Sequence, residues 1–260
     1  MGRIALGLEY DGTQFAGWQI QPKQRTVQAC LIEALQFVAN HDVKTVAAGR
    51  TDSGVHALQQ VVHFDTDADR DERNWILGLN TYLPKDMNVI WARPVDDSFS
   101  ARFSALNRRY RYLILNRVSR SAISHNKMWW YFQSLDIDLM QAAADLLVGH
   151  HDFSAFRAKE CQAHNPIKTM EMISITRQGD CIAIDVKAQS FLHHMVRNIV
   201  GVLVSIGEGK KPVSWALDVL DSRDRAQGGI TSPPEGLYFV NVEYPAQYAL
   251  PTVSTFPVVW

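Results

Sequence analysis

A short polar segment between two apolar runs carries the densest group of reactive side chains in this sequence. It consists of Ala47-Ala48-Gly49-Arg50-Thr51-Asp52-Ser53-Gly54-Val55-His56-Ala57. Gly49 and Gly54 bracket the polar residues, and glycine permits turns and close backbone approaches that other residues resist. Loops held between rigid strands are where reactive side chains are often presented. Asp52, two residues after Arg50, is therefore the first candidate for a carboxylate that takes part in chemistry.

Two hydrolase chemistries can be weighed for this segment. Asp52-Ser53-Gly54 matches the Asp-Ser/Thr-Gly of aspartic proteases, but those enzymes need two aspartates that share one proton. The chain has a single Asp-Ser-Gly: the Asp-Ser at 221–222, for example, is followed by Arg223. A dimer that supplied a second Asp52 would place Arg50 against the shared proton. Ser53 and His56 are three residues apart in one loop and lack a nucleophile elbow, which disfavours a catalytic triad.

A third chemistry uses one aspartate as a nucleophile, or as a stabiliser of positive charge, beside a flipped nucleotide base. The non-catalytic interpretation of Asp52 is a carboxylate that caps a turn. From the loop alone, both interpretations remain open.

The distribution of charge favours a polyanionic partner. The net charge is −1, yet positions 98–135 contain no Asp or Glu. The basic residues of that stretch are Arg102, Arg108, Arg109, Arg111, Arg117, Arg120 and Lys127. One basic face on a neutral protein suits nucleic acid, although a solvated strand would account for the charges equally well.

Composition restricts the class of protein. The 260 residues, 47% of them hydrophobic, suffice for one large core or two small ones. Three cysteines without Cys-x-x-Cys spacing, Cys30, Cys161 and Cys181, are typical of reduced thiols in a cytoplasmic protein. No apolar run reaches the length of a membrane span, and no signal peptide follows Met1, so we expect no membrane partner.

Hydrophobic periodicity predicts the element order β-α-β-β-α-β twice. The first half has strands at 3–11, 43–48, 60–64 and 87–95 and helices at 27–39 and 75–83, with Thr26 as an N-cap. The second half has strands at 109–115, 170–177, 181–188 and 237–242 and helices at 139–148 and 191–206. This order predicts an α+β fold of two ferredoxin-like halves with mainly antiparallel sheets, 1–104 and 105–260. The tail 246–260 has no clear period.

The string GRTDSGVHA at 49–57 resembles the active-site signature of the tRNA pseudouridine synthases that act on the anticodon stem-loop, the TruA family. Other blocks of that family have counterparts in the same order along the chain. They are YDGTQFAGWQ at 10–19, RTVQ at 25–28, RRYRY at 108–112, GHHDF at 149–153, FLHHMVRN at 191–198 and PEGLY at 234–238.

The resemblance implies conversion of uridine to pseudouridine at tRNA positions 38, 39 and 40. The family's catalytic aspartate maps onto Asp52, which would add to C1′, remove a proton to give a glycal, or attack C6. Arg197 is implied as the partner that keeps Asp52 ionised, since a buried carboxylate otherwise tends to protonate. From periodicity alone, Arg197 also fits a surface arginine. Tyr110 is implied as the aromatic ring that stacks on the extruded uracil, and from the strand pattern it also fits a core tyrosine.

The same resemblance implies further contacts to the substrate. Arg50 would fill the gap left by the flipped base or hold its phosphate, and Leu237 would wall the pocket. Arg109 and Arg111 would contact tRNA phosphates. The family works as a homodimer.

We expect no cofactor and no metal, because an isomerisation moves no electrons and needs no donated group. His193 and His194 are adjacent on the predicted helix and would point about 100° apart, which disfavours a shared metal. The alternative function is a non-catalytic RNA-binding module, since ferredoxin-like sheets bind RNA through exposed aromatic residues. Asp52 distinguishes the two, because a carboxylate facing phosphates would only weaken binding.

Overall fold

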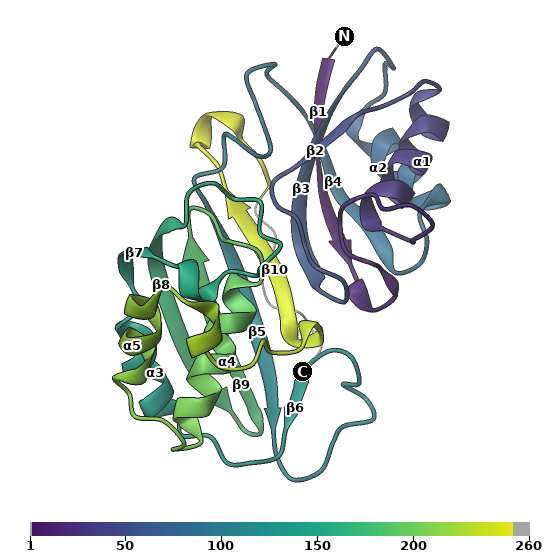
Figure 1. The fold of residues 1–260 in the computed structure, drawn as a ribbon. Helices are drawn as coiled ribbons and strands as arrows, with labels where there is room; N and C mark the ends of the chain where they lie inside the picture. Colours follow the sequence, from purple (N-terminus) through teal and green to yellow (C-terminus); the bar gives the residue numbers. More distant parts are fainter. Residues whose placement is uncertain (1, 252–260) are drawn as a thin grey trace. The chain divides into compact units, whose positions relative to one another are not determined.

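The computed structural model describes residues 2–251, which form two compact units (Figure 1). The first unit contains the chain up to Arg108 together with the segment that begins at Tyr238, and the second unit runs from Arg109 to Leu237. The sequence-based division at 104/105 assigned the last strand to the second half, whereas the structure assigns it from Tyr238 onward to the first unit. The physical reason for this assignment is that the strand pairs in parallel with a strand of the first unit, Tyr238 beside His56.

The first unit is a sheet with two helices on one face (Figure 1). Its elements are β1 (Gly2–Tyr10), α1 (Val27–Ala39), β2 (Thr45–Ala47), β3 (His56–Thr66), α2 (Glu72–Tyr82), β4 (Met87–Val95) and the final β10 (Leu237–Glu243). The strand order is β4-β1-β3, and all these pairs are antiparallel. Strand β2 lies antiparallel to β3, whereas β10 lies parallel to it. This is the predicted β-α-β-β-α-β order.

Local signals explain both helices of this unit. The Thr26 side chain accepts a hydrogen bond from Ala29 N at 3.4 Å at the start of α1, and the helix ends at Asn40 with φ of 59°. Helix α2 begins after Asp71, whose carboxylate accepts from Asn74 N at 2.6 Å. A side-chain oxygen at the N-cap satisfies an amide that has no partner within the helix.

The second unit repeats this order as far as its second long helix and has additional short elements. Its elements are β5 (Asn107–Asn116), β6 (Trp129–Tyr131), α3 (Ile137–Asp145), β7 (Gly149–Asp152), β8 (Ile167–Gln178), β9 (Cys181–Ala188), α4 (Met195–Gly207) and α5 (Trp215–Ser222). The strand order is β5-β9-β8-β7, with β6 parallel to β5. Helix α4 is buried along almost its whole length. The predicted α+β class with mainly antiparallel sheets is confirmed.

Helix α4 corrects one expectation. It begins at Met195, whereas the periodicity predicted a start at 191. His194 occupies the N-cap with φ of 61°, a left-handed conformation that cannot continue a right-handed helix. Residues 191–194 therefore lie before the helix, with a turn at 193–194, although the apolar side chains at 191–192 follow the helical period.

The short elements β6, β7 and α5 were not predicted. Strands of three and four residues and a helix of eight residues are too short to show a clear hydrophobic period. Of the aperiodic tail, residues 252–260 lie outside the described part of the chain. Its described part is held to the first unit: the Tyr248 ring packs edge-on against Phe99 at 5.0 Å, and Pro251 O accepts from Gln59 Nε2 at 3.0 Å.

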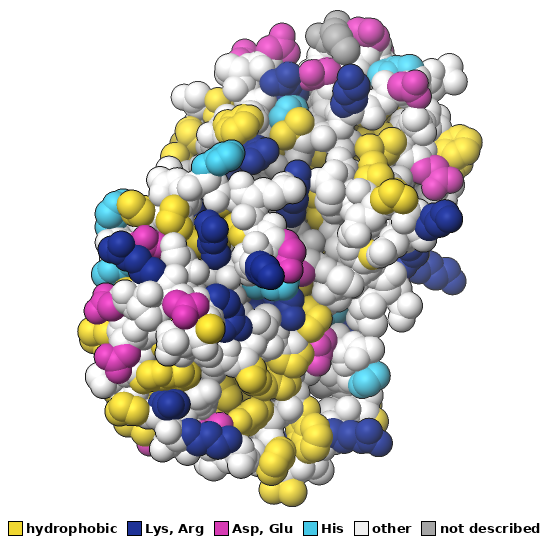
Figure 2. Space-filling model, viewed as in Figure 1, with side chains coloured by type: hydrophobic (Ala, Val, Ile, Leu, Met, Phe, Trp, Pro, Cys, Tyr) yellow, Lys and Arg dark blue, Asp and Glu magenta, His cyan; other side chains and the backbone are white. Residues whose placement is uncertain are grey.

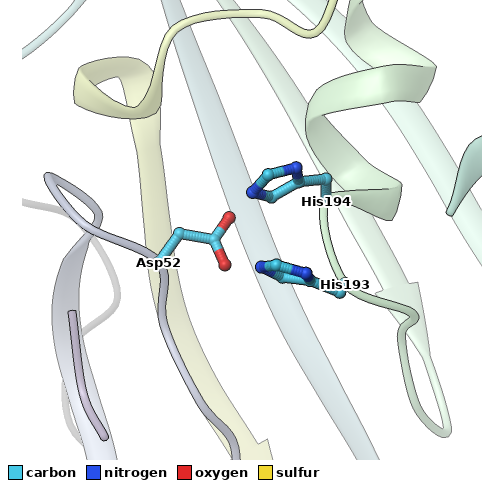
Figure 3. Close-up of side chains that lie close together, drawn as sticks. All are labelled: Asp52, His193 and His194. Atoms are coloured by element: carbon cyan, nitrogen blue, oxygen red, sulfur yellow. The ribbon is translucent and has the colours of Figure 1, made fainter. Parts of the chain in front are cut away.

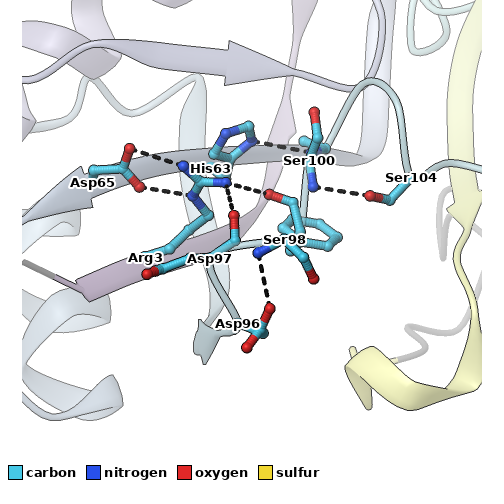
Figure 4. Close-up of polar contacts among 10 residues, drawn as sticks. Arg3, His63, Asp65, Asp96, Asp97, Ser98, Ser100 and Ser104 are labelled. Atoms are coloured by element: carbon cyan, nitrogen blue, oxygen red, sulfur yellow. Dashed lines mark hydrogen bonds and ion pairs between the residues drawn. The ribbon is translucent and has the colours of Figure 1, made fainter.

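Arg3 and His63 anchor the segment that follows β4 (Figure 4). The Arg3 guanidinium donates to both carboxylate oxygens of Asp65, at 2.7 and 2.9 Å, and to Phe99 O at 2.8 Å. The Nδ1 atom of buried His63 accepts from Ala101 N at 3.0 Å. Polar groups on β1 and β3 thus order a loop that has no regular structure of its own.

Among residues 2–251, no helix combines the length and the apolar character that a membrane crossing demands.

Candidate active site

Asp52 lies half-buried on the loop between β2 and β3 (Figure 3). Its backbone oxygen accepts from Val55 N at 3.2 Å, which closes a turn whose Gly54 has φ of 79°. Val55 and the preceding Thr51 are buried, so the loop is anchored on both sides of Asp52. A carboxylate on such a loop has a defined position, which nucleophilic chemistry requires.

The last residue of β1 and the segment after it hold this loop through four contacts. Tyr10 Oη lies 2.8 Å from Thr51 Oγ1, and Trp18 N donates to Thr51 O at 3.0 Å. On the other side of Asp52, Ser53 Oγ donates to Phe15 O at 3.2 Å, and the amide that follows Ser53 donates to the same oxygen at 3.3 Å. The block at 10–19, which carried part of the resemblance, is therefore the support of the Asp52 loop.

Two glycines make this close approach possible. A Cβ atom on Gly12 would lie 2.0 Å from Val55 O, and one on Gly17 would lie 2.7 Å from Thr51 O. Gly17 also has φ of 91°, which side chains rarely tolerate. Backbone meets backbone here, so no side-chain rearrangement could make room.

His56 is held by the same segment. It is 2% exposed, its Nδ1 lies 3.0 Å from Gly12 N and 3.1 Å from Asp11 Oδ1, and its ring stacks on Tyr238 at 4.7 Å. Ser53 directs its hydroxyl at Phe15 O. Both side chains thus have structural partners, which agrees with the rejection of a Ser53–His56 hydrolase. The sequence offered no sign of the contact between His56 and Gly12.

The remaining predicted residues are placed as follows. Arg50 is exposed. Tyr110 lies on β5, is 8% exposed and meets the Phe191 ring edge-on at 5.0 Å. Tyr112, on the same face, is fully buried and donates to a backbone carbonyl, so it is a core residue. Leu237 is the buried first residue of β10.

Arg197 lies in the first turn of α4, half-buried, where the longer predicted helix would have put it about two turns from the start. Its Nε donates to Ser232 O at 2.7 Å. His193 and His194 precede the helix (Figure 3), and their ring centroids are 4.0 Å apart. The expectation that helix geometry separates the two rings was therefore wrong, since neither residue is inside the helix.

Arg109 and Arg111 share a carboxylate that the sequence analysis missed. The Asp185 carboxylate on β9 lies 3.0 Å from Arg109 Nη2 and 2.8 Å from Arg111 Nη2. Asp185 is 6% exposed. It is the one acidic residue in strand β9, and an acid within an otherwise apolar strand could have indicated a basic partner. Positions 98–135 contain no acidic residue, but the neighbouring strand β9 supplies a carboxylate to two of their arginines.

The predicted site residues are divided between the two units. Asp52 and Arg50 belong to the first unit, together with the segment that supports their loop. The second unit contains Tyr110, Arg197, Leu237, Arg109 and Arg111.

Comparisons with known proteins agree along the whole chain. The family model described as tRNA pseudouridine synthase matches residues 8–104 and 143–245. A protein named tRNA pseudouridine synthase A from Nitrosococcus oceani is 54% identical over 258 residues, which cover 99% of this chain and 100% of that relative. The proteins of the same name from Alcanivorax borkumensis and Paraburkholderia phytofirmans are 54% and 50% identical, with 99% and 100% of this chain and 97% and 96% of theirs covered. The chain therefore belongs to the tRNA pseudouridine synthase family, as an isomerase that converts uridine in tRNA to pseudouridine.

Proposed function

We propose that the chain isomerises the uridines at positions 38, 39 and 40 of the tRNA anticodon stem-loop, with Asp52 as the nucleophile. The observation that carries this is the anchoring of the Asp52 loop on both sides, within the string GRTDSGVHA. Cleavage of the glycosidic bond builds positive charge on the ribose, and a fixed carboxylate stabilises such charge without reorganising. The same carboxylate can add to C1′, remove a proton to give a glycal, or attack C6.

Arg197 is proposed as the group that keeps Asp52 ionised. At contact distance in a partly screened site, a guanidinium and a carboxylate attract each other by roughly 4 kcal/mol before desolvation. The Ser232 carbonyl at 2.7 Å from Arg197 Nε already orients that guanidinium. Replacing Arg197 with Ala should therefore remove turnover by mispositioning or protonating Asp52.

Tyr110, Leu237 and Arg50 are proposed to receive the extruded nucleotide. Extruding a uridine from a stem costs a few kcal/mol, and stacking on an aromatic ring returns roughly 1–3 kcal/mol. Tyr110 is supported in its position by a T-shaped contact with the ring of Phe191. Leu237 would wall the pocket, and the exposed Arg50 would occupy the vacated space in the stem or hold its phosphate.

Arg109 and Arg111 are proposed to position the RNA backbone. Together with Asp185 they carry a net charge of +1, and the shared carboxylate holds the two guanidiniums side by side. Arg109 is the more exposed, with 31% of its side chain accessible against 12% for Arg111. Phosphate contacts of this kind fix the register of the RNA and make its affinity depend on salt.

We also propose that the enzyme works in the cytoplasm as a homodimer, without cofactor or metal. Figure 2 shows hydrophobic side chains gathered over the region of β5 and β6. The exposed large residues of this region are Val118, Ile123, Trp130 and Phe132. Trp130 and Phe132 lie next to each other, with ring centroids 6.1 Å apart. Large apolar side chains exposed together are typical of interfaces between protein chains. Measuring the mass of the particle in solution for wild type and for Ile123→Glu tests this surface, and a monomeric wild type would contradict it.

The decisive experiment replaces Asp52 with Asn, which keeps the shape and removes the charge. Tritium release from tRNA labelled at uridine C5 should cease, while tRNA affinity is retained. Asp221→Asn is the matched control, since Asp221 is also followed by serine but is exposed on α5. Full turnover of Asp52→Asn would refute the catalytic assignment and favour a non-catalytic RNA-binding protein.

A further inference from the structure

The chain that follows α5 returns across the first half of α4 in close contact with it. We call this segment, residues 225–232, the strap. A Cβ atom on Gly201 of α4 would lie 1.8 Å from Ile230 O, and one on Gly229 would lie 2.9 Å from Gly201 O. The strap thus touches the helix backbone directly, and two glycines are needed to permit it. Its last residue, Ser232, donates its N–H to Arg197 O at 3.2 Å.

A polar network joins the strap to the residue beside Arg197. Arg225 Nη2 donates to Asn198 Oδ1 at 3.0 Å and to Thr231 Oγ1 at 2.9 Å. Thr231 Oγ1 in turn donates to Asn198 Oδ1 at 2.6 Å. Asn198 is 2% exposed, and its Nδ2 donates to Phe156 O at 2.8 Å. A buried network whose members are paired in this way is rigid, because each lost contact would leave a polar group unsatisfied.

The network has no carboxylate among its members. Arg225 is half-buried, and its hydrogen-bond partners among residues 2–251 are neutral. Desolvation lowers the pKa of its guanidinium. A surface arginine would be expected to point into water or at an acid. The use of a desolvated arginine to bind one amide and one hydroxyl indicates that the position of these groups matters.

The strap also orients the Arg197 side chain directly. Ser232 O accepts from Arg197 Nε at 2.7 Å, so the residue whose N–H binds the Arg197 backbone also binds its side chain. A guanidinium is planar, with its donors in a fixed fork. One strong hydrogen bond at Nε therefore sets the direction of the two terminal amino groups.

We propose that the strap aims the Arg197 guanidinium, and that Arg225, Asn198 and Thr231 are positioning residues for it. This rests on the proposed function, in which Arg197 keeps the nucleophile Asp52 ionised. None of the three residues needs to touch RNA. They act by holding Ser232 O at the place from which it directs Arg197.

The test uses Thr231→Val, which removes one hydroxyl at nearly constant volume, and Arg225→Lys, which keeps the charge but loses the planar fork. In both variants, kcat should fall by about tenfold, since small displacements of a catalytic constellation cost that much or more. The acid limb of the kcat/KM profile should move up by about one pH unit, because a poorly aimed Arg197 stabilises the Asp52 carboxylate less. The KM for tRNA should stay unchanged. Thr231→Ser, which keeps the hydroxyl group, should have the wild-type pH profile.

Thr176→Val is the matched control, since Thr176 is exposed on β8 of the same unit. Melting curves report folding separately: a merely structural role would lower the melting temperature and the active fraction without moving the acid limb. If Thr231→Val and Arg225→Lys have the wild-type pH profile while Asp52→Asn is inactive, the proposed role of the strap is refuted and the proposed function stands. An active Asp52→Asn would overturn the proposed function itself.

Discussion

The phenolic oxygen of Tyr10 lies 2.8 Å from the hydroxyl oxygen of Thr51, the residue that precedes Asp52. Tyr10 is 4% exposed, and burial raises the pKa of its phenol, which therefore keeps its proton at every working pH. The contact joins the end of β1 to the loop that bears the proposed nucleophile. It is one of the four contacts through which the first unit holds the Asp52 loop.

Tyr10→Phe should lower kcat with little change in the KM for tRNA, because it frees the Thr51 side chain and loosens the loop. Loss of one buried hydrogen bond costs about 1 kcal/mol of unfolding free energy, too little to unfold the domain. Steady-state kinetics on tRNA with Tyr10→Phe, Thr51→Val and the double variant measure the coupling. Additive effects in the double variant would show that the two hydroxyls act independently.

Gly12→Ala should abolish turnover, because the new methyl group would overlap the carbonyl oxygen of Val55 at 2.0 Å. Both contacting groups are backbone, so relief requires the Asp52 loop to move, at a cost of about 1–3 kcal/mol. Gly2→Ala, where a Cβ atom meets nothing within 4 Å, is the control. Turnover and urea unfolding of both variants check this, and an active Gly12→Ala would show that the loop tolerates displacement.

Arg109→Gln should reduce the salt dependence of tRNA affinity. Loss of one phosphate contact lowers the slope of log K against log salt by about 1. Arg93→Gln removes the same charge from a partly exposed pair with Glu72 in the first unit and should leave the slope unchanged. Binding titrations at several salt concentrations measure these slopes. Equal slopes for wild type and Arg109→Gln would show that Arg109 does not contact an RNA phosphate.

Asp185→Asn should destabilise the second unit. Asp185 is nearly buried between two guanidiniums, and without its charge Arg109 and Arg111 repel each other. Removing one partner of a fully buried ion pair costs about 3–5 kcal/mol. Arg109 and Arg111 are partly exposed, so the expected cost here is about 1–3 kcal/mol. Urea unfolding of the variant measures this cost, and a wild-type midpoint would show that solvent and the remaining polar groups compensate the two charges.

Protonation of His63 should destabilise the protein in mild acid. Burial and the neighbouring Arg3 lower the pKa of His63 below its ordinary 6.5, although Asp65 opposes the shift. The folded state thus favours the neutral ring, whose Nδ1 accepts from Ala101 N. As pH falls below about 6.5, the unfolded chain binds a proton that the folded chain does not, so the free energy of unfolding falls.

Urea midpoints for wild type and for His63→Asn, measured from neutral pH into mild acid, test this. The asparagine oxygen can accept from Ala101 N without titrating, so the variant should lose less stability on acidification than wild type does. His125→Asn, at an exposed position, should behave like wild type. Parallel losses in all three proteins would assign the acid sensitivity to other groups.

Most secondary structure of this chain was predictable from periodicity and caps. Helix α1 has the predicted bounds because Thr26 caps it and its apolar stripe is regular. The start of α4 was not predictable in the same way. Residues 191–192 continue the apolar period, and only the left-handed backbone at His194 stops the helix. Hydrophobic periodicity indicates which side chains are buried but not the backbone conformation. Non-helical residues before a helix can bury the side chains that a further helical turn would bury.

The sequence by itself determined the family and the proposed nucleophile, because Asp52 stands in a string whose residue types and order are specific. Only the tertiary structure decided what holds these residues in place. The contact of Tyr10 with Thr51, the carboxylate of Asp185 between two arginines, and the strap over α4 each join positions far apart in sequence. Such pairings leave no periodic trace, because they depend on which strands and loops become neighbours when the core is buried. A side chain's chemistry is local, whereas its position is set by the whole fold.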